Sequence, residues 1–597
     1  MITIEIPRKN KKIVCKPNIK LLDILIKNNE FVESPCGGKG SCGRCKIKHI
    51  SGELSPITED EERLLSDEEI SNGIRLACLV KPKSDIKIDV VEQEQNHKVL
   101  TEGYVPKFNM SPAIWKRVIN IEKPTLENPI SYEELFRKKL GLDEMEWDVL
   151  RTLKMRSGTF TAVYNEEKLI GLEYGDTFDE LYGIAVDIGT TTVVASLIDL
   201  NTGEEIDSEA EINPQKIFGQ DVLTRITYVI ENGDKGIKDL QEAIVNSLNK
   251  MINNMCGRKA LNKDMIYEMS VAANSTMMHI LLGIEPISLG KSPYSQIFSG
   301  RKNVPAMDVG LNSMSKFARL NCLPSVSSYI GSDVVAGAYV AELHSTDKKI
   351  LFVDIGTNGE IVLSNTGKLV SCSCAAGPAL EGMNISCGMR AADGAIEDIK
   401  ITEDKIILDI IGDKEPSGIC GSGILAAVRE MKKHKIINER GGIIKPETID
   451  EFDYRQKYIA KNSNKRFVKI ADGGNNILIS QGDVRQVQLA KSAILSGFMA
   501  LVQFMGIKLF ELDEVVVAGQ FGAHLSAESL VMTGILPKEV ENKIKYIGNS
   551  SKTGAYLSLI SLESRKEMCE LAKNIDYIEL SVLDGYEKLF VECSRFK

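Results

Sequence analysis

The sequence predicts a multidomain protein with α/β and α+β parts, and four observations support this. A chain of 597 residues is too long for one hydrophobic core and should divide into three or four domains. From Gly183 onward, short apolar β-runs alternate with helical patterns, as in α/β folds. Within this region a single pattern occurs twice, with its aspartates Asp187 and Asp354 lying 167 positions apart. The first 92 residues show strand alternation around a loop rich in glycine and cysteine.

These observations predict five regions. Residues 1–92 form a small β-rich domain, and residues 93–110, which lose periodicity, form a linker. Residues 111–182 form a small middle domain whose fold the sequence leaves open. Residues 183–345 and 346–597 form two related half-domains, each containing one copy of the repeated pattern.

Local patterns give the first elements. Met1–Pro7 and Lys11–Lys16 alternate in polarity and predict a hairpin, and Asn18 is expected to cap the helix that follows. In the middle domain the patterns predict a helix over Asp143–Met155 and a strand over Phe160–Leu172.

Composition excludes several classes of protein. With 43% hydrophobic and 26% charged residues the chain is an ordinary globular protein, and a net charge of −10 argues against nucleic acid or an anionic membrane as partner. No apolar segment with a cleavage site follows Met1, so we expect no secretory signal and a cytoplasmic protein. The uncharged stretch Ser492–Ile507 is short for a membrane span and predicts a buried helix. No Walker A sequence is present.

Four of the thirteen cysteines form a metal-site pattern. Cys36, Cys42 and Cys45 give C-x5-C-x2-C, and Cys78 follows 32 residues later. A [2Fe–2S] cluster needs four thiolates, and a sharply bending loop can supply three of them. Glycines permit such a bend, and four lie in this loop, namely Gly37, Gly38, Gly40 and Gly43. Zinc is the alternative metal, but zinc sites usually pair two short cysteine knuckles, and a set of unrelated core cysteines is the other alternative.

The repeated pattern predicts a phosphate site. Asp187 is followed by Gly189, Thr190, Thr191 and Thr192, and Asp354 is followed by Gly356, Thr357, Asn358 and Gly359. Each copy offers a carboxylate for Mg²⁺ and a turn of N–H and hydroxyl donors for phosphate oxygens. One such turn alone is usually an ordinary β-turn. Two copies facing each other predict a cleft that binds a nucleoside triphosphate with Mg²⁺.

Two further glycine segments extend this prediction. An apolar strand leads into Gly519 and Gly522, where a missing side chain lets an adenine ring approach the backbone. The segment Gly418–Gly423 opens an apolar helix whose N-terminus would favour phosphate. For either segment alone, a tight turn is the plainer interpretation.

These motifs resemble those of known families. Residues 1–92 resemble the [2Fe–2S] ferredoxins, with the five-residue cysteine spacing of the adrenodoxin-like branch, and this resemblance implies a β-grasp domain. Residues 183–597 resemble the superfamily of acetate kinase, sugar kinases, Hsp70 and actin, which implies a duplicated RNase H-like ATPase. In that superfamily the two aspartate turns hold the phosphates and Mg²⁺, and the Gly519–Gly522 segment holds adenosine.

The combination resembles the reductive activators of corrinoid-dependent methyltransferase systems. Three further segments carry this likeness, namely Asn213-Pro214-Gln215 with Gly219, Asp221 and Arg225, then Ala273–Met277, and then Ala376–Gly382. Asn274 and Glu381 are polar groups that suit a cleft, and the other residues receive no role. The resemblance implies ATP-dependent reduction of a partner's corrinoid from Co(II) to Co(I). Asp187 and Asp354 would organise Mg²⁺ and the attacking water. An upstream electron donor is implied, and a homodimer fits the family.

Three other functions stay open. A small-molecule kinase with a redox-regulated ferredoxin domain would need a sugar site rich in aromatic side chains. No such cluster is evident in the ATPase region, and Trp115 and Trp147 both precede it. An activator of a radical acyl-CoA dehydratase would carry its cluster between subunits. A simple electron carrier would leave the C-terminal 415 residues unexplained.

Overall fold

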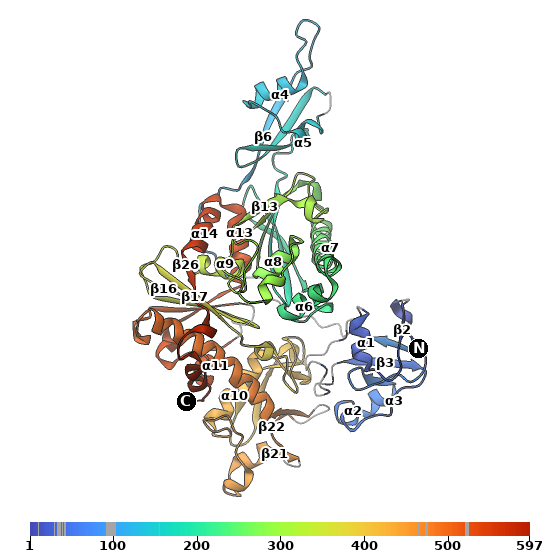
Figure 1. Ribbon diagram of the computed structural model, residues 1–597, viewed down its shortest axis with the longest axis vertical. Helices are drawn as coiled ribbons and strands as arrows, with labels where there is room; N and C mark the ends of the chain where they lie inside the picture. Colours follow the sequence, from blue (N-terminus) through green and yellow to red (C-terminus); the bar gives the residue numbers. More distant parts are fainter. Residues whose placement is uncertain are drawn as a thin grey trace.

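The computed structural model describes residues 1–9, 11–28, 30, 32, 38, 40, 43, 45–90, 103–153, 156–462, 465–471, 476–519 and 525–596. Figure 1 shows a small N-terminal sheet beside a two-lobed body, with a third region projecting from one end. The arrangement confirms the predicted fold class. The domain boundaries stay predictions, and we use the name "middle segment" for residues 111–181.

The N-terminal region contains a mixed five-stranded sheet in the order β2-β1-β5-β3-β4. Strands β1 and β2 form the predicted antiparallel hairpin, whereas β1 and β5 are parallel. The strands are β1 (Ile2–Ile6), β2 (Lys11–Cys15), β3 (Lys46–Ser51), β4 (Ile74–Leu76) and β5 (Ile86–Val90). The helices are α1 (Leu21–Lys27), α2 (Glu59–Leu64) and α3 (Asp67–Ser71).

The predicted cap of the first helix is wrong. Helix α1 begins at Leu21 after Lys20, and no side chain caps it. Asn18 lies in the left-handed region at φ 64°, a turn conformation that asparagine tolerates better than most residues. The apolar stripe of the helix is buried as expected, with Leu21 and Leu25 fully inaccessible.

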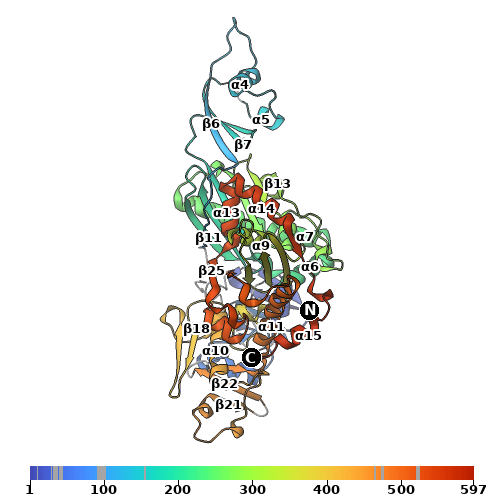
Figure 2. The same cartoon turned by 90° about the vertical axis from the view of Figure 1, so that its left-hand side faces the viewer.

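The middle segment is a three-stranded antiparallel sheet with two short helices. The strands are β6 (Ile114–Ile121), β7 (Gly158–Asn165) and β8 (Lys168–Tyr174), and the helices are α4 (Tyr132–Leu140) and α5 (Trp147–Leu150). The predicted helix over Asp143–Met155 is reduced to the single turn of α5, and the predicted strand over Phe160–Leu172 is a hairpin that turns at Glu166, φ 54°. Figures 1 and 2 both show this segment projecting from the first lobe.

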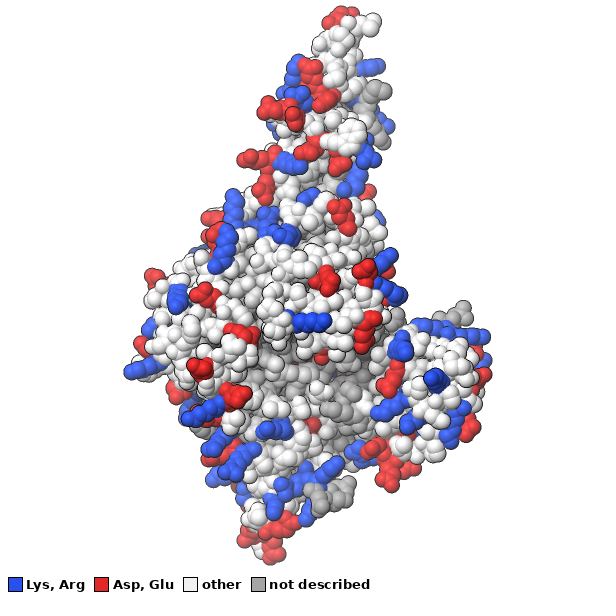
Figure 3. Space-filling view, viewed as in Figure 1, with Lys and Arg blue, Asp and Glu red and all other residues white. Residues whose placement is uncertain are grey.

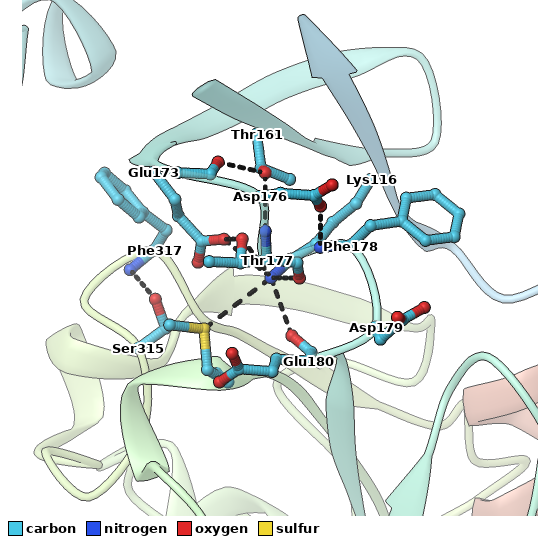
Figure 4. Close-up of polar contacts among 12 residues, drawn as sticks. Lys116, Thr161, Glu173, Asp176, Thr177, Phe178, Asp179, Glu180, Ser315 and Phe317 are labelled. Carbon is cyan, nitrogen blue, oxygen red and sulfur yellow. Dashed lines mark hydrogen bonds and ion pairs between the residues drawn. The ribbon is translucent and has the colours of Figure 1, made fainter. Parts of the chain in front are cut away.

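Lys116 of β6 joins the middle segment to the first lobe (Figure 4). Its ammonium group lies 2.7 Å from Glu173 Oε2 and donates to the carbonyls of Thr177 and Glu180 at 3.1 and 2.7 Å. It also lies 5.0 Å above the ring of Tyr267, a residue of the first lobe. The Lys116 side chain is inaccessible to solvent, so this charge is balanced within the protein.

Two six-stranded sheets form the lobes. The first lobe has the order β11-β10-β9-β12-β14-β13 and the second has β25-β24-β15-β16-β17-β26. The first contains β9 (Tyr182–Ile188), β10 (Thr192–Asp199), β11 (Glu205–Ile212), β12 (Ile266–Ala273), β13 (Lys302–Pro305) and β14 (Arg319–Cys322). The second contains β15 (Ile350–Ile355), β16 (Gly359–Asn365), β17 (Lys368–Cys374), β24 (Glu514–Ala518), β25 (Ile544–Gly548) and β26 (Ile575–Tyr577).

The sheets confirm the duplication inferred from the repeated pattern. In each lobe an antiparallel meander of three strands begins with the aspartate strand, β9 or β15. A later strand then pairs parallel to that first strand, β12 in the first lobe and β24 in the second. The two aspartates therefore occupy equivalent strand ends.

Helices cover both sheets and fill the space between them. The first lobe carries α6 (Val222–Asn232), α7 (Asp234–Lys259) and α8 (Ser275–Leu281), and the second carries α10 (Gly421–Lys433), α11 (Gln481–Phe504), α12 (Ala527–Thr533) and α15 (Tyr586–Cys593). One core is shared by both lobes and is built around α9 (Ser332–Val340), α13 (Ser550–Ile560) and α14 (Leu562–Asn574). Helix α13, from the C-terminal portion of the chain, packs on β9 and β12 of the first lobe.

Helix α11 contains most of the uncharged stretch noted in the sequence. Among the described residues it is the one helix that is long and apolar enough to cross a membrane, and 72% of its apolar window is buried inside the protein. It packs on β16 and β17, as the prediction of a buried helix requires.

Two smaller sheets extend the second lobe. One consists of β18 (Ala395–Ile401), β19 (Ile406–Ile410) and β20 (Gly418–Ile419), and the other of β21 (Ile459–Asn462), β22 (Lys465–Ala471) and β23 (Ile477–Ser480). On the face shown in Figure 3, acidic and basic side chains are interspersed over both lobes.

Candidate functional site

The first aspartate turn lies at the end of β9. Asp187 is the penultimate residue of the strand, and the N–H of Gly189 donates to the carbonyl of Thr192 at 2.9 Å, which closes the turn. The Asp187 carboxylate accepts two hydrogen bonds from the start of α13, from Asn549 Nδ2 at 3.1 Å and Ser551 Oγ at 2.8 Å. These two donors fix the orientation of the carboxylate.

The second aspartate turn lies at the equivalent end of β15. The N–H of Gly356 donates to the carbonyl of Asn358 at 2.9 Å, and Asp354 faces Gly519 at the end of β24. Gly519 has φ 93°, and a Cβ atom there would lie 2.4 Å from Asp354 Oδ1. Glycine at this position is therefore needed for the carboxylate to take its place. Gly522 lies outside the described residues.

The two turns meet at one cavity of about 270 Å³, which we call the interlobe cleft. Its lining includes nearly all the predicted site residues that the structure describes in the two lobes, namely Asp187, Gly189, Thr190, Thr191, Thr192, Asp354, Gly356, Thr357, Asn358 and Gly519. Gly359 is not among them, because it packs inward, where a Cβ atom would lie 3.0 Å from Cys374 Sγ. The first residues of α10 also line the cleft, as expected for the Gly418–Gly423 segment.

Glu381 connects the two turns. Its carboxylate accepts a hydrogen bond from Thr191 Oγ1 at 3.1 Å and another from Thr357 Oγ1. Asn274 contacts the first turn from a different side, donating to Thr190 Oγ1 at 3.1 Å. Both residues that the sequence suggested as polar groups of the cleft therefore lie in it.

The cleft is strongly acidic. Burial, and next the charge of Asp187, raise the pKa of Asp354 to about 7. Burial likewise raises the pKa of Asp333 to about 7, with Asp354 as the next cause. Burial and then the neighbouring carboxylates also raise the pKa of Glu360. These four acidic side chains share one cavity and repel one another, so a cation stabilises their ionised forms.

The carboxylates do not form a complete metal site by themselves. Across the residues that the structure describes, no three His, Cys, Asp or Glu side chains are arranged to hold a metal ion. Mg²⁺ typically binds one or two protein carboxylates together with water and substrate phosphates. The donor set of the cleft fits that mode of binding.

Several polar residues of the cleft were not predicted from the sequence, among them Asp333, Glu360, Asn549 and Ser551. Asp333 begins α9 and has the pattern of an ordinary helix start, and Glu360 is one polar residue in the alternation of β16. Asn549 and Ser551 lie more than 360 positions from Asp187. A signal for this last pair existed in the polar run Asn549-Ser550-Ser551, directly after the strand β25.

Two of the four predicted cluster ligands are described. Cys45 and Cys78 are buried, and their Sγ atoms lie 3.2 Å apart, too far for a disulfide and close enough to bind one metal ion together. Gly38, Gly40 and Gly43 all have positive φ, as the predicted sharp loop requires. Cys36 and Cys42 lie outside the described residues. The two thiols that are described fit an iron–sulfur cluster.

Gly103 and Tyr104 of the predicted linker pair with the end of β25, the strand that leads to the interlobe cleft. The N–H of Tyr104 donates to the carbonyl of Ile547 at 2.9 Å, and Gly103 pairs with Gly548, directly before Asn549. A Cβ atom on Gly103 would lie 2.4 Å from Thr553 Oγ1. This close pairing places Gly103 and Tyr104 beside the start of α13, where Asn549 and Ser551 hold Asp187.

Comparison with known families matches three parts of the chain. Residues 4–83 match the family described as the 2Fe-2S iron–sulfur cluster binding domain. Residues 182–346 match the family described as the RACo middle region, which corresponds here to the first lobe. Residues 348–597 match the C-terminal domain of RACo, the ASKHA domain.

Similar proteins agree with these matches. The chain is 30% identical over 584 residues to the corrinoid activation enzyme RamQ of Eubacterium limosum, an alignment that covers 94% of this chain and 93% of the relative. It is 24% identical over 447 residues to the [Co(II) methylated amine-specific corrinoid protein] reductase of Methanosarcina barkeri, covering 69% of this chain and 76% of the relative.

Solved structures point in the same direction. The structure of a reductive activator for corrinoid, iron–sulfur protein superposes with a TM-score of 0.71 at 30% identity, covering 100% of this chain and 98% of that one. The fold, the three matched regions and the similar proteins agree. The chain belongs to the family of reductive activators of corrinoid proteins, in which a 2Fe-2S domain is joined to a C-terminal ASKHA domain.

Proposed function

We propose that this chain uses ATP to transfer one electron to the corrinoid of a partner protein in a methyltransferase system, reducing Co(II) to Co(I). The observation that carries the proposal is the meeting of the two aspartate turns at one cleft, in a chain whose N-terminal region belongs to the 2Fe-2S family. ATP and water are consumed and ADP and phosphate are released, and one electron passes from an upstream reductant to cobalt.

The interlobe cleft provides the residues for ATP. Asp187 and Asp354, which both line the cleft, would hold Mg²⁺ and orient the attacking water. The backbone and hydroxyl groups of Thr190–Thr192 and Thr357–Asn358 face the same cavity and suit phosphate oxygens. The N-terminus of α10 also lines the cleft and would favour phosphate on the second-lobe side.

Cys36, Cys42, Cys45 and Cys78 would hold a [2Fe–2S] cluster, which supplies a one-electron carrier when bound. The close approach of Cys45 and Cys78 supports this assignment. The reducing cytoplasm is the compartment in which such thiols remain available, and we infer that the reaction takes place there. An upstream electron donor and a homodimer are further elements of the proposal.

The need for ATP follows from the energetics. Plant-type [2Fe–2S] centres have potentials near about −400 mV, and Co(I) is harder to reach than such a donor can readily provide. For one electron, each shortfall of about 59 mV lowers the equilibrium ratio tenfold. A nucleotide that binds the closed form of the two lobes more tightly than the open form shifts the lobes toward the closed form. The free energy of that shift can offset the shortfall in potential. Glu381, which contacts both turns, is placed to respond to closure.

The test is an anaerobic optical assay. The reconstituted, reduced protein is mixed with a corrinoid protein of a methylated-amine system in the Co(II) state, with free cob(II)alamin in a parallel sample. We expect the Co(II) spectrum to be lost with Mg–ATP and retained with Mg–ADP. Phosphorylation of a metabolite without any change at cobalt would overturn the proposal in favour of a kinase.

A further inference from the structure

The segment Asn213–Arg225 contacts the first aspartate turn from behind. It contains the residues Asn213, Gln215, Gly219, Asp221 and Arg225, to which the sequence assigned no role. The segment leaves β11 at Ile212, forms a short 3₁₀ turn, and enters α6 at Val222, where Asp221 caps the helix. Asn213 and Arg225 are both inaccessible to solvent.

Three consecutive carbonyl groups of the turn have their hydrogen-bond partners in this segment. Asn213 Nδ2 donates to the carbonyl of Gly189 at 2.8 Å, and Arg225 Nη2 donates to that of Thr190 at 2.5 Å. The backbone N–H of Asn213 donates to the carbonyl of Thr191 at 2.9 Å. All three carbonyls are thereby held on the side of the turn that faces this segment.

The direction of the carbonyls determines the direction of the N–H groups. In a planar trans peptide the C=O of one residue points opposite to the N–H of the next. Holding the carbonyls of Gly189 and Thr190 toward Asn213 and Arg225 therefore turns the N–H groups of Thr190 and Thr191 the other way, toward the cleft that both residues line. Successive N–H groups directed at one point form an anion-binding concavity.

Arg225 is itself held in a fixed position. Its guanidinium donates to the carbonyl of Gly219 at 3.0 Å and to Gln215 Oε1 at 3.1 Å, in addition to Thr190. Gly219 has no room for a side chain, because a Cβ atom there would lie 2.6 Å from the N atom of Arg225. Gln215 is anchored in turn by donating to the carbonyl of Leu240 at 3.1 Å.

The charge of Arg225 has no carboxylate within ion-pair distance among the described residues. Its guanidinium contacts two carbonyls, an amide oxygen and the sulfur of Met277, all neutral. Burial lowers the pKa of Arg225 to about 9, so the group remains a cation at neutral pH. A buried cation directly behind the turn makes the cleft side of the turn more favourable for phosphate.

We propose that Asn213 and Arg225 are positioning residues of the nucleotide site, which direct the N–H groups of the first turn at the phosphates of the bound nucleotide and place a buried positive charge behind them. The proposal deepens the ATP-dependent function proposed above and rests on it. It also gives a role to Gly219 and Gln215, which hold Arg225 in place.

The test compares nucleotides that differ only in their phosphates. Dissociation constants for ATP, ADP and AMP are measured by calorimetry with Mg²⁺ for the full-length protein and for the Arg225→Met, Arg225→Lys and Asn213→Ser variants. We expect Arg225→Met to weaken ATP by about tenfold or more and AMP by less than about twofold, because AMP lacks the phosphates that face the turn. Arg225→Lys, which keeps the charge, should recover some of the loss, and Asn213→Ser should show a smaller loss of the same kind.

Arg319→Met is the matched control. Arg319 lies in the same lobe and also donates to a carbonyl and an amide oxygen, those of Asn303 at 2.6 and 2.9 Å, but it does not line the cleft. The ATP-to-AMP affinity ratio of the Arg319→Met variant should equal that of the unaltered protein. If Arg225→Met does not fold, the two milder variants decide the test.

The outcomes separate this inference from the proposed function. Failure of the unaltered protein to bind ATP would refute both. Binding of ATP by the unaltered protein, with equal losses for all three nucleotides or no loss in the variants, would refute the positioning role alone.

Discussion

Thr191 of the first lobe donates a hydrogen bond to Glu381 of the second lobe at 3.1 Å, across 190 positions of sequence. The same carboxylate accepts from Thr357, the residue that corresponds to Thr190 in the second turn. One side chain thus contacts both copies of the duplicated pattern. Because each lobe carries one turn, the separation of the turns reports how far the cleft is closed.

Replacing Glu381 should therefore impair ATP turnover. Glu381→Ala removes both hydrogen bonds, and a bond to a charged group contributes roughly 1.5–3 kcal/mol, so kcat/KM for ATP should fall about tenfold to hundredfold. Steady-state ATPase assays measure this. Glu403→Ala, an exposed glutamate of the same lobe, is the control and should leave kcat/KM unchanged. Unchanged turnover in Glu381→Ala would show that the bridge has no role in catalysis.

Affinity for Mg–ATP should rise with pH. The pKa of Asp354 and that of Asp333 are raised from 3.8 to about 7, chiefly by burial, and Mg²⁺ favours the ionised forms. Between pH 6 and 8 the affinity should rise by up to about tenfold per pH unit for each proton released. Calorimetry in buffers of different ionisation enthalpy measures both the affinity and the protons. Asp333→Asn should reduce the slope, and a pH-independent affinity would contradict the assignment.

The same carboxylates should make the nucleotide-free protein less stable as the pH rises. Their folded-state pKa values lie above the unfolded values, so the folded protein binds protons more tightly between pH 3.8 and about 7. Stability from these groups is therefore lost as the pH rises through that range. The increase in Tm caused by Mg–ATP should be larger at pH 8 than at pH 6. An equal increase in Tm at pH 6 and pH 8 would show that ionisation of these two aspartates does not control the stability.

The aspartate turns could be predicted because each is a local motif. Asp187 and Asp354 are recognisable from the residues beside them, and their repetition identifies the duplicated lobes. Asn549 and Ser551 could not be found in this way, because only the packing of α13 on β9 brings them to Asp187. In the middle segment the helix caps were the overlooked signal. Ser131 and Gly141 bound α4 as N-cap and left-handed C-cap, outside the predicted helix.

The cluster ligands should be separable from the nucleotide site. Cys78→Ser should abolish the [2Fe–2S] absorption of reconstituted protein and the transfer of electrons, because serine replaces a thiolate ligand. ATP binding should be unchanged, since the interlobe cleft contains neither Cys45 nor Cys78. Cys15→Ser, a half-buried cysteine at the end of β2 in the N-terminal region, is the control and should retain the spectrum. A normal spectrum in Cys78→Ser would exclude Cys78 as a ligand.

Lys116 should hold the middle segment on the first lobe. Lys116→Met leaves Glu173 without its buried ion-pair partner, a change that typically destabilises by about 3–5 kcal/mol. Hydrogen–deuterium exchange should increase in residues 158–181 and remain unchanged in the second lobe. The exposed Lys123→Met is the control. Unaltered protection in Lys116→Met would show that other contacts join the middle segment to the lobe.

The coupling of ATP to electron transfer is tested most directly by counting cobalt atoms reduced per ATP hydrolysed. The reduced protein is mixed anaerobically with a Co(II) corrinoid protein, and Co(I) and phosphate are followed together. We predict a fixed ratio in the unaltered protein and loss of both products, by about 10²–10⁴-fold, in the Asp187→Asn, Asp354→Asn double variant. Reduction of cobalt at the normal rate by that variant would contradict the account.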